Sequence, residues 1–239
     1  MVASPTGTVG YLACMRVFLA GATGATGRVF VPVAEKRGHP LVLHVRPTTA
    51  ARHPLGQDPR AVVFDLADES ALRAAIRDCD VIVSLVGTMK KRFAGGDTYE
   101  TSDIGSTRQL VEAAKAERIS RFRLLSSYGA GGPGAYAQMK GECERIVMAA
   151  ADIRWTIFRP SALVSPEWDT TEHLGRREVP GFASWLGGAL RAVPGLSGTA
   201  DDLRPMPLEV LCRAMVSTLE NPRDREILGG RDIWPLGDI

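Results

Sequence analysis

The chain has 239 residues, of which 45% are hydrophobic and 23% are charged, which fits one α/β domain with at most a small appended lobe. These proportions exclude a disordered, collagen-like or coiled-coil protein. The 29 basic and 27 acidic side chains leave a net charge of only +2, which argues against a strongly basic binder of nucleic acids or membrane surfaces.

The chain begins with a segment that fits no element of a fold. Residues 1–15 lack the basic start of a signal peptide, and we expect them to form a loose tail, with Met15 as a candidate natural start. From Arg16 onward, short apolar runs alternate with amphipathic segments. We predict strands at Arg16–Ala20, Leu41–Val45, Ala61–Phe64, Val81–Val86, Phe122–Leu125 and Trp155–Phe158. We predict helices at Ala25–Arg37, Glu69–Asp78 (with Asp68 as N-cap), Thr98–Glu117 and Tyr136–Ala150.

This alternation of strands and helices predicts an α/β fold with a doubly wound parallel sheet. After Pro160 the pattern weakens. Residues 161–206 are rich in Gly, Pro and Trp, and we interpret them as loops with a short helix near 183–192 that form a small substrate lobe or lid. A helix at Leu208–Leu219 and a late strand, at Glu226–Leu228 or Asp232–Trp234, complete a single domain over residues 16–239.

Scattered cysteines and histidines give no metal or disulfide pattern. The four cysteines form no CxxC pair, which favours a reducing cytoplasm, and the four histidines show no zinc-ligand spacing. No apolar run reaches the length of a membrane span. We therefore expect no metal and a small-molecule substrate, with neither nucleic acid nor membrane as partner; the oligomeric state is not predicted.

Three glycines at regular spacing follow the first strand and open the first helix. Gly21 permits a tight turn, Gly24 lets the backbone approach a pyrophosphate, and Gly27 allows close helix–strand packing. The helix N-terminus then offers N–H groups to phosphates. A glycine turn without ligand is the alternative, but the spacing favours a dinucleotide. The candidate residues are Gly21, Ala22, Thr23, Gly24, Ala25, Thr26, Gly27 and Arg28.

The residue after the second strand bears on the choice of cofactor. NAD sites usually place Asp or Glu here, whereas an Arg accommodates the 2′-phosphate of NADP. In this chain the residue is Arg46, with no acidic residue nearby. We predict NADP(H) in preference to NAD(H), although Arg46 as a solvated loop residue is the alternative.

A tyrosine and a lysine open the helix after the fifth strand. The spacing of Tyr136 and Lys140 puts both side chains on one helix face. A nearby ammonium favours the phenolate of a tyrosine, which makes Tyr136 a candidate general acid. Ser126 and Ser127, at the end of the fifth strand, are candidates to hydrogen-bond a substrate carbonyl. A YxxxK pair alone is usually surface decoration, so its value lies in its position.

With these motifs in their order, the chain resembles the short-chain dehydrogenase/reductase superfamily, which has the Rossmann fold, and within it the atypical branch of the Tat-interacting-protein type. The likeness covers about residues 16–165. It implies that Lys140 also binds the nicotinamide ribose. It further implies cofactor contacts at Asp65 and Leu66 (adenine), Val86 and Gly87 (ribose), and Pro160, Ser161, Ala162 and Leu163 (nicotinamide). The superfamily's catalytic Asn would fall near Ser102 or Asp103, and neither is Asn.

We expect an NADPH-dependent oxidoreductase that transfers hydride to a carbonyl or similar acceptor of a small organic substrate, with Tyr136 as the acid. Two alternatives stay open. One is a non-catalytic NADPH-binding regulator or redox sensor, which the missing Asn favours. The other is a redox-neutral isomerase or lyase that keeps its nicotinamide bound. Residues 88–97 and 165–206 are the regions expected to contact substrate, and the sequence does not identify that substrate.

Overall fold

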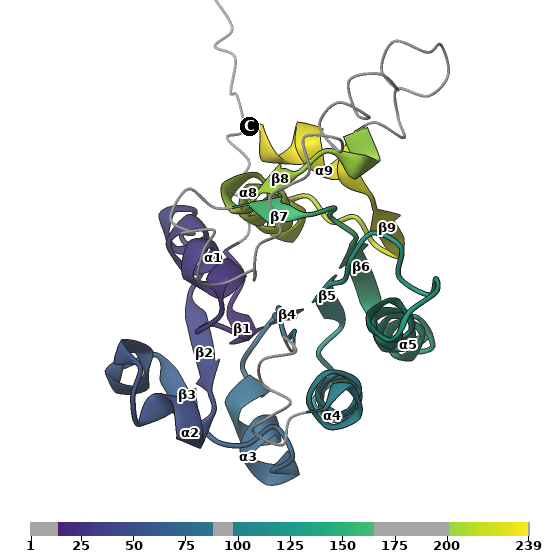
Figure 1. Cartoon of the computed structure of the whole chain (residues 1–239). Helices are drawn as coiled ribbons and strands as arrows, with labels where there is room; N and C mark the ends of the chain where they lie inside the picture. Colours follow the sequence, from purple (N-terminus) through teal and green to yellow (C-terminus); the bar gives the residue numbers. More distant parts are fainter. Residues whose placement is uncertain (1–13, 88–97, 165–200, 239) are drawn as a thin grey trace, which may run out of the picture.

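The computed structural model describes residues 14–87, 98–164 and 201–238. Its centre is a seven-stranded sheet in the order β3-β2-β1-β4-β5-β6-β9, and every neighbouring pair is parallel (Figure 1). The strands are β1 (Val17–Ala20), β2 (Leu41–Val45), β3 (Ala61–Val63), β4 (Val81–Ser84), β5 (Arg121–Leu125), β6 (Arg154–Phe158) and β9 (Glu226–Leu228). The doubly wound parallel sheet is confirmed.

The apolar strands lie at the centre because helices cover both faces of the sheet. Alternate residues of β1 enter different cores: Val17 and Leu19 face one side, while Phe18 and Ala20 face the other. The first core is closed by α1 (Ala25–Lys36) and α8 (Leu208–Glu220), and the second by α3 (Glu69–Ile76), α4 (Gly105–Ala116) and α5 (Ala135–Met148) (Figure 1). This arrangement leaves the strand ends as the accessible edge of the sheet.

The strand order reverses at the centre of the sheet. The chain runs outward from β1 through β2 to β3 and then returns to β4 on the other side of β1. The carboxyl ends of β1 and β4 therefore diverge into loops that leave in opposite directions, the position at which α/β proteins bind ligands.

Most predicted elements are confirmed to within two residues, including the N-cap Asp68, whose carboxylate accepts the Ala71 N–H at 3.0 Å. Asp232–Trp234 is not a strand, because it lies in helix α9 (Gly230–Gly237). Two short helices that were not predicted follow β2: α2 (Pro47–Ala50) and η1 (Pro54–Gln57). Both begin with a proline, which suits the first turn of a helix.

The predicted helix over Thr98–Glu117 is present, but its first part is not α-helical. Residues Tyr99–Ile104 form η3, a π-helix, and α4 begins only at Gly105. The Gly105 N–H donates to the Glu100 carbonyl, and a Cβ on Gly105 would lie 3.1 Å from that oxygen. The wider turn is therefore possible because residue 105 has no side chain. π-Turns within helices are frequent at functional sites.

A small two-stranded ribbon flanks the segment that was predicted to form the lid. Strand β7 (Leu163–Val164) pairs in parallel with β8 (Met206–Pro207), which leads directly into α8. The helix expected near 183–192 lies outside the described residues. Met15 is buried in the first core, so this residue belongs to the packed domain and not to the predicted loose tail. Among the described helices, none combines the length and the apolar character needed to cross a bilayer.

Candidate cofactor and active site

A cleft of about 540 Å³ opens at the carboxyl ends of β1, β2 and β4, where the strand order reverses. Its walls come from the glycine turn, from the ends of β2 and β3, from the end of β4 and from the η3–α4 segment. Its lining residues are Gly21, Thr23, Gly24, His44, Arg46, Asp65, Leu66, Ala67, Leu85, Val86, Gly87, Thr101, Ser102, Gly105, Ser106 and Gln109.

The glycine turn leaves no room for side chains at two of its three glycines. Gly21 has φ +96°, and a Cβ there would lie 2.9 Å from the Leu85 carbonyl carbon. A Cβ on Gly27 would lie 2.3 Å from the Gly21 oxygen. Gly24 is the N-cap of α1 and makes no side-chain capping bond, so the first N–H groups of the helix receive no cap from this residue. The turn fits a pyrophosphate group.

The structure does not bring every predicted residue of this turn to the cleft. Gly21, Thr23 and Gly24 line it, whereas Ala22 is fully buried in the core beneath. Ala25, Thr26 and Gly27 begin α1 behind the turn, and Arg28 is exposed on that helix. A contact of these residues with a cofactor stays a prediction.

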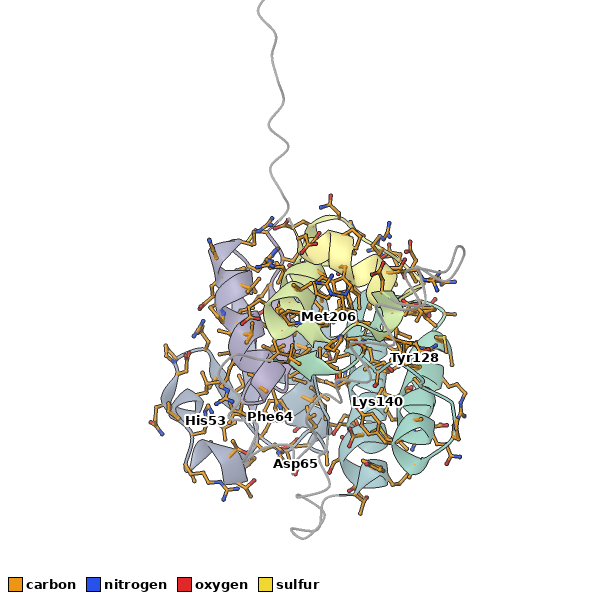
Figure 2. All side chains as sticks on the ribbon, turned by 45° about the horizontal axis from the view of Figure 1, so that its top comes forward. His53, Phe64, Asp65, Tyr128, Lys140 and Met206 are labelled. Atoms are coloured by element: carbon orange, nitrogen blue, oxygen red, sulfur yellow. The ribbon has the colours of Figure 1, made fainter. Side chains whose placement is uncertain are left out.

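The outer end of the cleft is formed by the ends of β2 and β3. Arg46 and Asp65 both line it, as the sequence predicted (Asp65 is labelled in Figure 2). Asp65 also closes its own turn, because its carboxylate accepts the Ala67 N–H at 2.9 Å. Asp65 thus stabilises a turn and lines the cleft at the same time.

His44 belongs to the same end of the cleft but was not predicted. Its Nε2 lies 2.9 Å from the Phe64 carbonyl oxygen, and its ring packs against Phe18 and Phe64. Burial lowers the pKa of His44 below 6.5, mainly through desolvation, so the imidazole is neutral at neutral pH. This end of the cleft thus combines the packed rings of His44 and Phe64 with the cationic side chain of Arg46.

The wall formed by η3 and α4 was also missed. It contributes five small or polar residues to the cleft: Thr101, Ser102, Gly105, Ser106 and Gln109. Their spacing by four residues along a helix was the available signal. The neighbouring Asp103 is buried, so of the two positions considered for the missing Asn, Ser102 borders the cleft and Asp103 does not.

Lys140 connects α5 to the cleft. It is only 3% exposed, and its Nζ donates to the Val86 carbonyl at 3.3 Å and to the Leu125 carbonyl at 3.2 Å. A Cβ on Gly87 would come within 3.9 Å of this Nζ. The ammonium is therefore held just beyond the ends of β4 and β5, next to the predicted cofactor residues Val86 and Gly87.

Tyr136 lies one turn before Lys140 on the same helix face. The Nζ of Lys140 is 6.0 Å from the centre of its ring, and the Tyr99 ring packs edge-on at 6.2 Å. Tyr136 remains 44% exposed. Desolvation is the main cause that raises the pKa of Tyr99 above its ordinary value. Tyr136 is thus the phenol of this pair with the more accessible position.

The two candidate serines have different environments. Ser126 is buried, and its hydroxyl donates to the carboxylate of Glu144 on α5. Ser127 is half-buried, and its nearest acceptor is the Tyr128 carbonyl oxygen at 3.4 Å, the length of a weak bond. The structure therefore gives the Ser126 hydroxyl a strong internal partner and leaves the Ser127 hydroxyl weakly held.

The segment Pro160–Leu163 runs from the end of β6 toward the C-terminal part of the chain. The Pro160 carbonyl accepts the Tyr128 N–H at 2.8 Å. The Ser161 hydroxyl donates to the Arg204 carbonyl, and the Ala162 carbonyl accepts the Met206 N–H at 2.8 Å. The segment lies beside the loop Ser126–Tyr128, and its contact with a nicotinamide stays a prediction.

Comparisons with known proteins relate the chain to a cofactor-binding family. A model of an NAD(P)H-binding family matches residues 21–182. The chain is 30% identical to the protein HTATIP2 of Rattus norvegicus over 236 residues, which cover 92% of this chain and 88% of that protein. It is 32% identical to the divinyl chlorophyllide a 8-vinyl-reductase of Oryza sativa subsp. indica over 159 residues, or 61% of this chain and 39% of that protein.

The protein FMP52 of Debaryomyces hansenii, named as mitochondrial, is 29% identical over 156 residues, or 63% of this chain and 67% of that protein, so the cytoplasmic location stays a prediction. A solved short-chain dehydrogenase/reductase superfamily protein from Agrobacterium tumefaciens with bound NAD has a TM-score of 0.64 at 17% identity over 92% of this chain and 81% of that chain. This likeness shows the fold alone. The chain belongs to the NAD(P)H-binding family, with HTATIP2 as a relative, as its motifs predicted.

Proposed function

We propose that this protein is an NADPH-dependent reductase that acts on a carbonyl, or a similarly polarised acceptor, of a small organic substrate. The observation that carries the proposal is the position of Lys140. Its ammonium is fixed at the edge of the dinucleotide cleft by the Val86 and Leu125 carbonyls, with the exposed Tyr136 one turn away. A cation, an accessible phenol and a cofactor cleft are the parts that an acid-assisted reduction requires.

Tyr136 and Lys140 have different roles in this reaction. When bound, the nicotinamide supplies the hydride. Tyr136 donates the proton to the acceptor oxygen, and the Lys140 ammonium stabilises the negative charge that develops on the phenol oxygen. Lys140 also offers donors to the nicotinamide ribose. The mostly buried position of Lys140 strengthens both interactions, because charges interact more strongly away from water.

Ser127 is the serine we assign to the acceptor oxygen. The Ser126 hydroxyl proton points at Glu144, so it is not available to a substrate. Ser127 follows Ser126 directly, in the loop after β5. Its weak bond to the Tyr128 carbonyl is easily exchanged for a bond to the acceptor.

Arg46 supports the choice of NADPH. It is the one cationic residue among those that line the described cleft, at the end where the adenosine ribose is expected. We expect NADPH to bind more tightly than NADH. Arg46→Ala should weaken NADPH binding by about tenfold or more, the effect of one charged hydrogen bond, and leave NADH binding unchanged. Titration of each variant with NADPH and with NADH measures the two affinities. Arg77→Ala, at the C-terminal end of α3, is the matched control. Equal affinities for NADPH and NADH in the unaltered protein would contradict the assignment.

The function itself is tested by NADPH consumption with a panel of small aldehydes, ketones and enones. We expect at least one class to be reduced with the stoichiometric loss of NADPH. Tight NADPH binding without consumption across the panel would favour the non-catalytic regulator instead.

A further inference from the structure

A third residue of α5 continues the face formed by Tyr136 and Lys140. Glu144 is eight residues after Tyr136 and four after Lys140, so all three project from the same side of the helix. Glu144 is only 1% exposed. Its carboxylate accepts the Ser126 hydroxyl and two bonds from the Arg159 guanidinium, one of them from Nε at 2.8 Å. One carboxylate of α5 thus holds two residues, one just after β5 and one just after β6.

The backbones on either side of Glu144 are joined as well. The Ser126 N–H donates to the Phe158 carbonyl and the Tyr128 N–H donates to the Pro160 carbonyl, both at 2.8 Å. The β5–β6 pairing therefore continues beyond the ends of both strands. These bonds join the loop Ser126–Tyr128 to the start of the Pro160–Leu163 segment, and Glu144 links both to α5.

The ion pair between Glu144 and Arg159 gives this link a defined geometry. A buried carboxylate is tolerated only when it is paired and hydrogen-bonded, and Arg159 supplies both conditions. The hydrogen bonds to Glu144 raise the pKa of Arg159 above its ordinary value, while its side chain keeps 31% exposure. Bidentate arginine–carboxylate pairs fix direction as well as distance. The geometry is therefore set by the pair and not by packing alone.

We propose that Glu144 is a positioning residue that fixes, through Ser126 and Arg159, where Ser127 and Pro160–Leu163 stand relative to Tyr136. The inference rests on the proposed function, because its consequence is the alignment of acid, serine and nicotinamide. It also gives Ser126 a role: this residue anchors the loop that presents Ser127.

Glu144→Gln tests the proposal with almost no change of shape. One of the two acceptor oxygens becomes an NH₂ group and the negative charge is lost, so the side chain can no longer accept both bonds of the Arg159 guanidinium. We expect kcat to fall by about 10- to 100-fold, the range for a misplacement of about 1 Å, with the KM for NADPH and its affinity unchanged. Glu117→Gln, which weakens the Arg73–Glu117 ion pair between α3 and α4, is the matched control and should leave kcat unchanged.

A second measurement does not depend on turnover. In Glu144→Gln, amide hydrogen exchange should become faster at Tyr128, whose N–H bonds Pro160, and stay as before at Leu43, whose N–H bonds Arg60. Ser126→Ala, which removes a single hydroxyl, should show a smaller change of the same kind and covers the case in which Glu144→Gln does not fold.

The two proposals fail in different ways. If the unaltered protein shows no turnover, the proposed function fails, and the exchange measurement alone then decides on Glu144. Unchanged exchange at Tyr128 in both variants, or an equal increase at Tyr128 and Leu43, would overturn the positioning role. Unchanged kcat in an active protein would overturn it as well.

Discussion

Replacing Tyr136 by Phe is expected to lower kcat by about 10²- to 10⁴-fold, the usual contribution of a positioned general acid, and to leave the affinity for NADPH unchanged. The side chain is 44% exposed, so the loss of its hydroxyl removes a proton donor without opening a cavity. Steady-state turnover and cofactor titration on the same preparation measure the two effects separately. Fluorescence or calorimetry should show an unaltered unfolding midpoint.

Tyr99→Phe is the matched control, because the Tyr99 ring packs edge-on against Tyr136 and is the other phenol close to it. This variant should keep most of the turnover, since the raised pKa of Tyr99 makes it a poorer proton donor. A loss of turnover in Tyr99→Phe, together with normal activity in Tyr136→Phe, would exchange the roles of the two residues.

Gly27→Ala is expected to lower both the stability of the protein and its affinity for cofactor. The added Cβ would lie 2.3 Å from the Gly21 oxygen and 2.5 Å from the Ala22 oxygen, so α1 must move away from β1. Overpacking of this kind costs about 1–3 kcal/mol of unfolding free energy. The displaced helix also withdraws its N–H groups from the phosphates, so NADPH affinity should fall by at least about tenfold.

Gly24→Ala separates these two effects. Its Cβ would lie 3.3 Å from the Gly21 oxygen, on the cleft side of a residue with φ −74°. We expect weaker NADPH binding with little loss of stability, in contrast to Gly27→Ala. Denaturant unfolding without cofactor, followed by titration, compares the variants; a Gly27→Ala protein as stable as the unaltered one would contradict the packing argument.

The sequence was sufficient for the features that depend on local patterns. The apolar run before Gly21 and the glycine spacing predicted β1, the turn and α1, because a buried parallel strand and a phosphate turn each need specific residue types in sequence. The four-residue spacing of Tyr136 and Lys140 likewise predicted a shared helix face. The structure adds that Lys140 reaches the cleft through the Val86 and Leu125 carbonyls.

The features that the sequence did not reveal depend on long-range partners. Ser126 and Ser127 are equivalent in sequence, and only the position of Glu144 distinguishes them. Arg123 is an equally clear case: it lies fully buried in strand β5 and donates to the Thr218 carbonyl at 2.9 Å. Burial lowers its pKa to about 10. No local pattern predicts this buried arginine, because its partner Thr218 is 95 residues away along the chain.

The central claim is hydride transfer from NADPH to a substrate, and isotope transfer tests it most directly. The unaltered protein is incubated with NADPH carrying deuterium at the reactive position of the nicotinamide and, in turn, with each carbonyl compound of the panel. The account predicts deuterium bound to the former carbonyl carbon of the product, transferred from one face of the nicotinamide only. Bound NADPH that keeps its deuterium while every carbonyl compound stays unreduced would contradict the account.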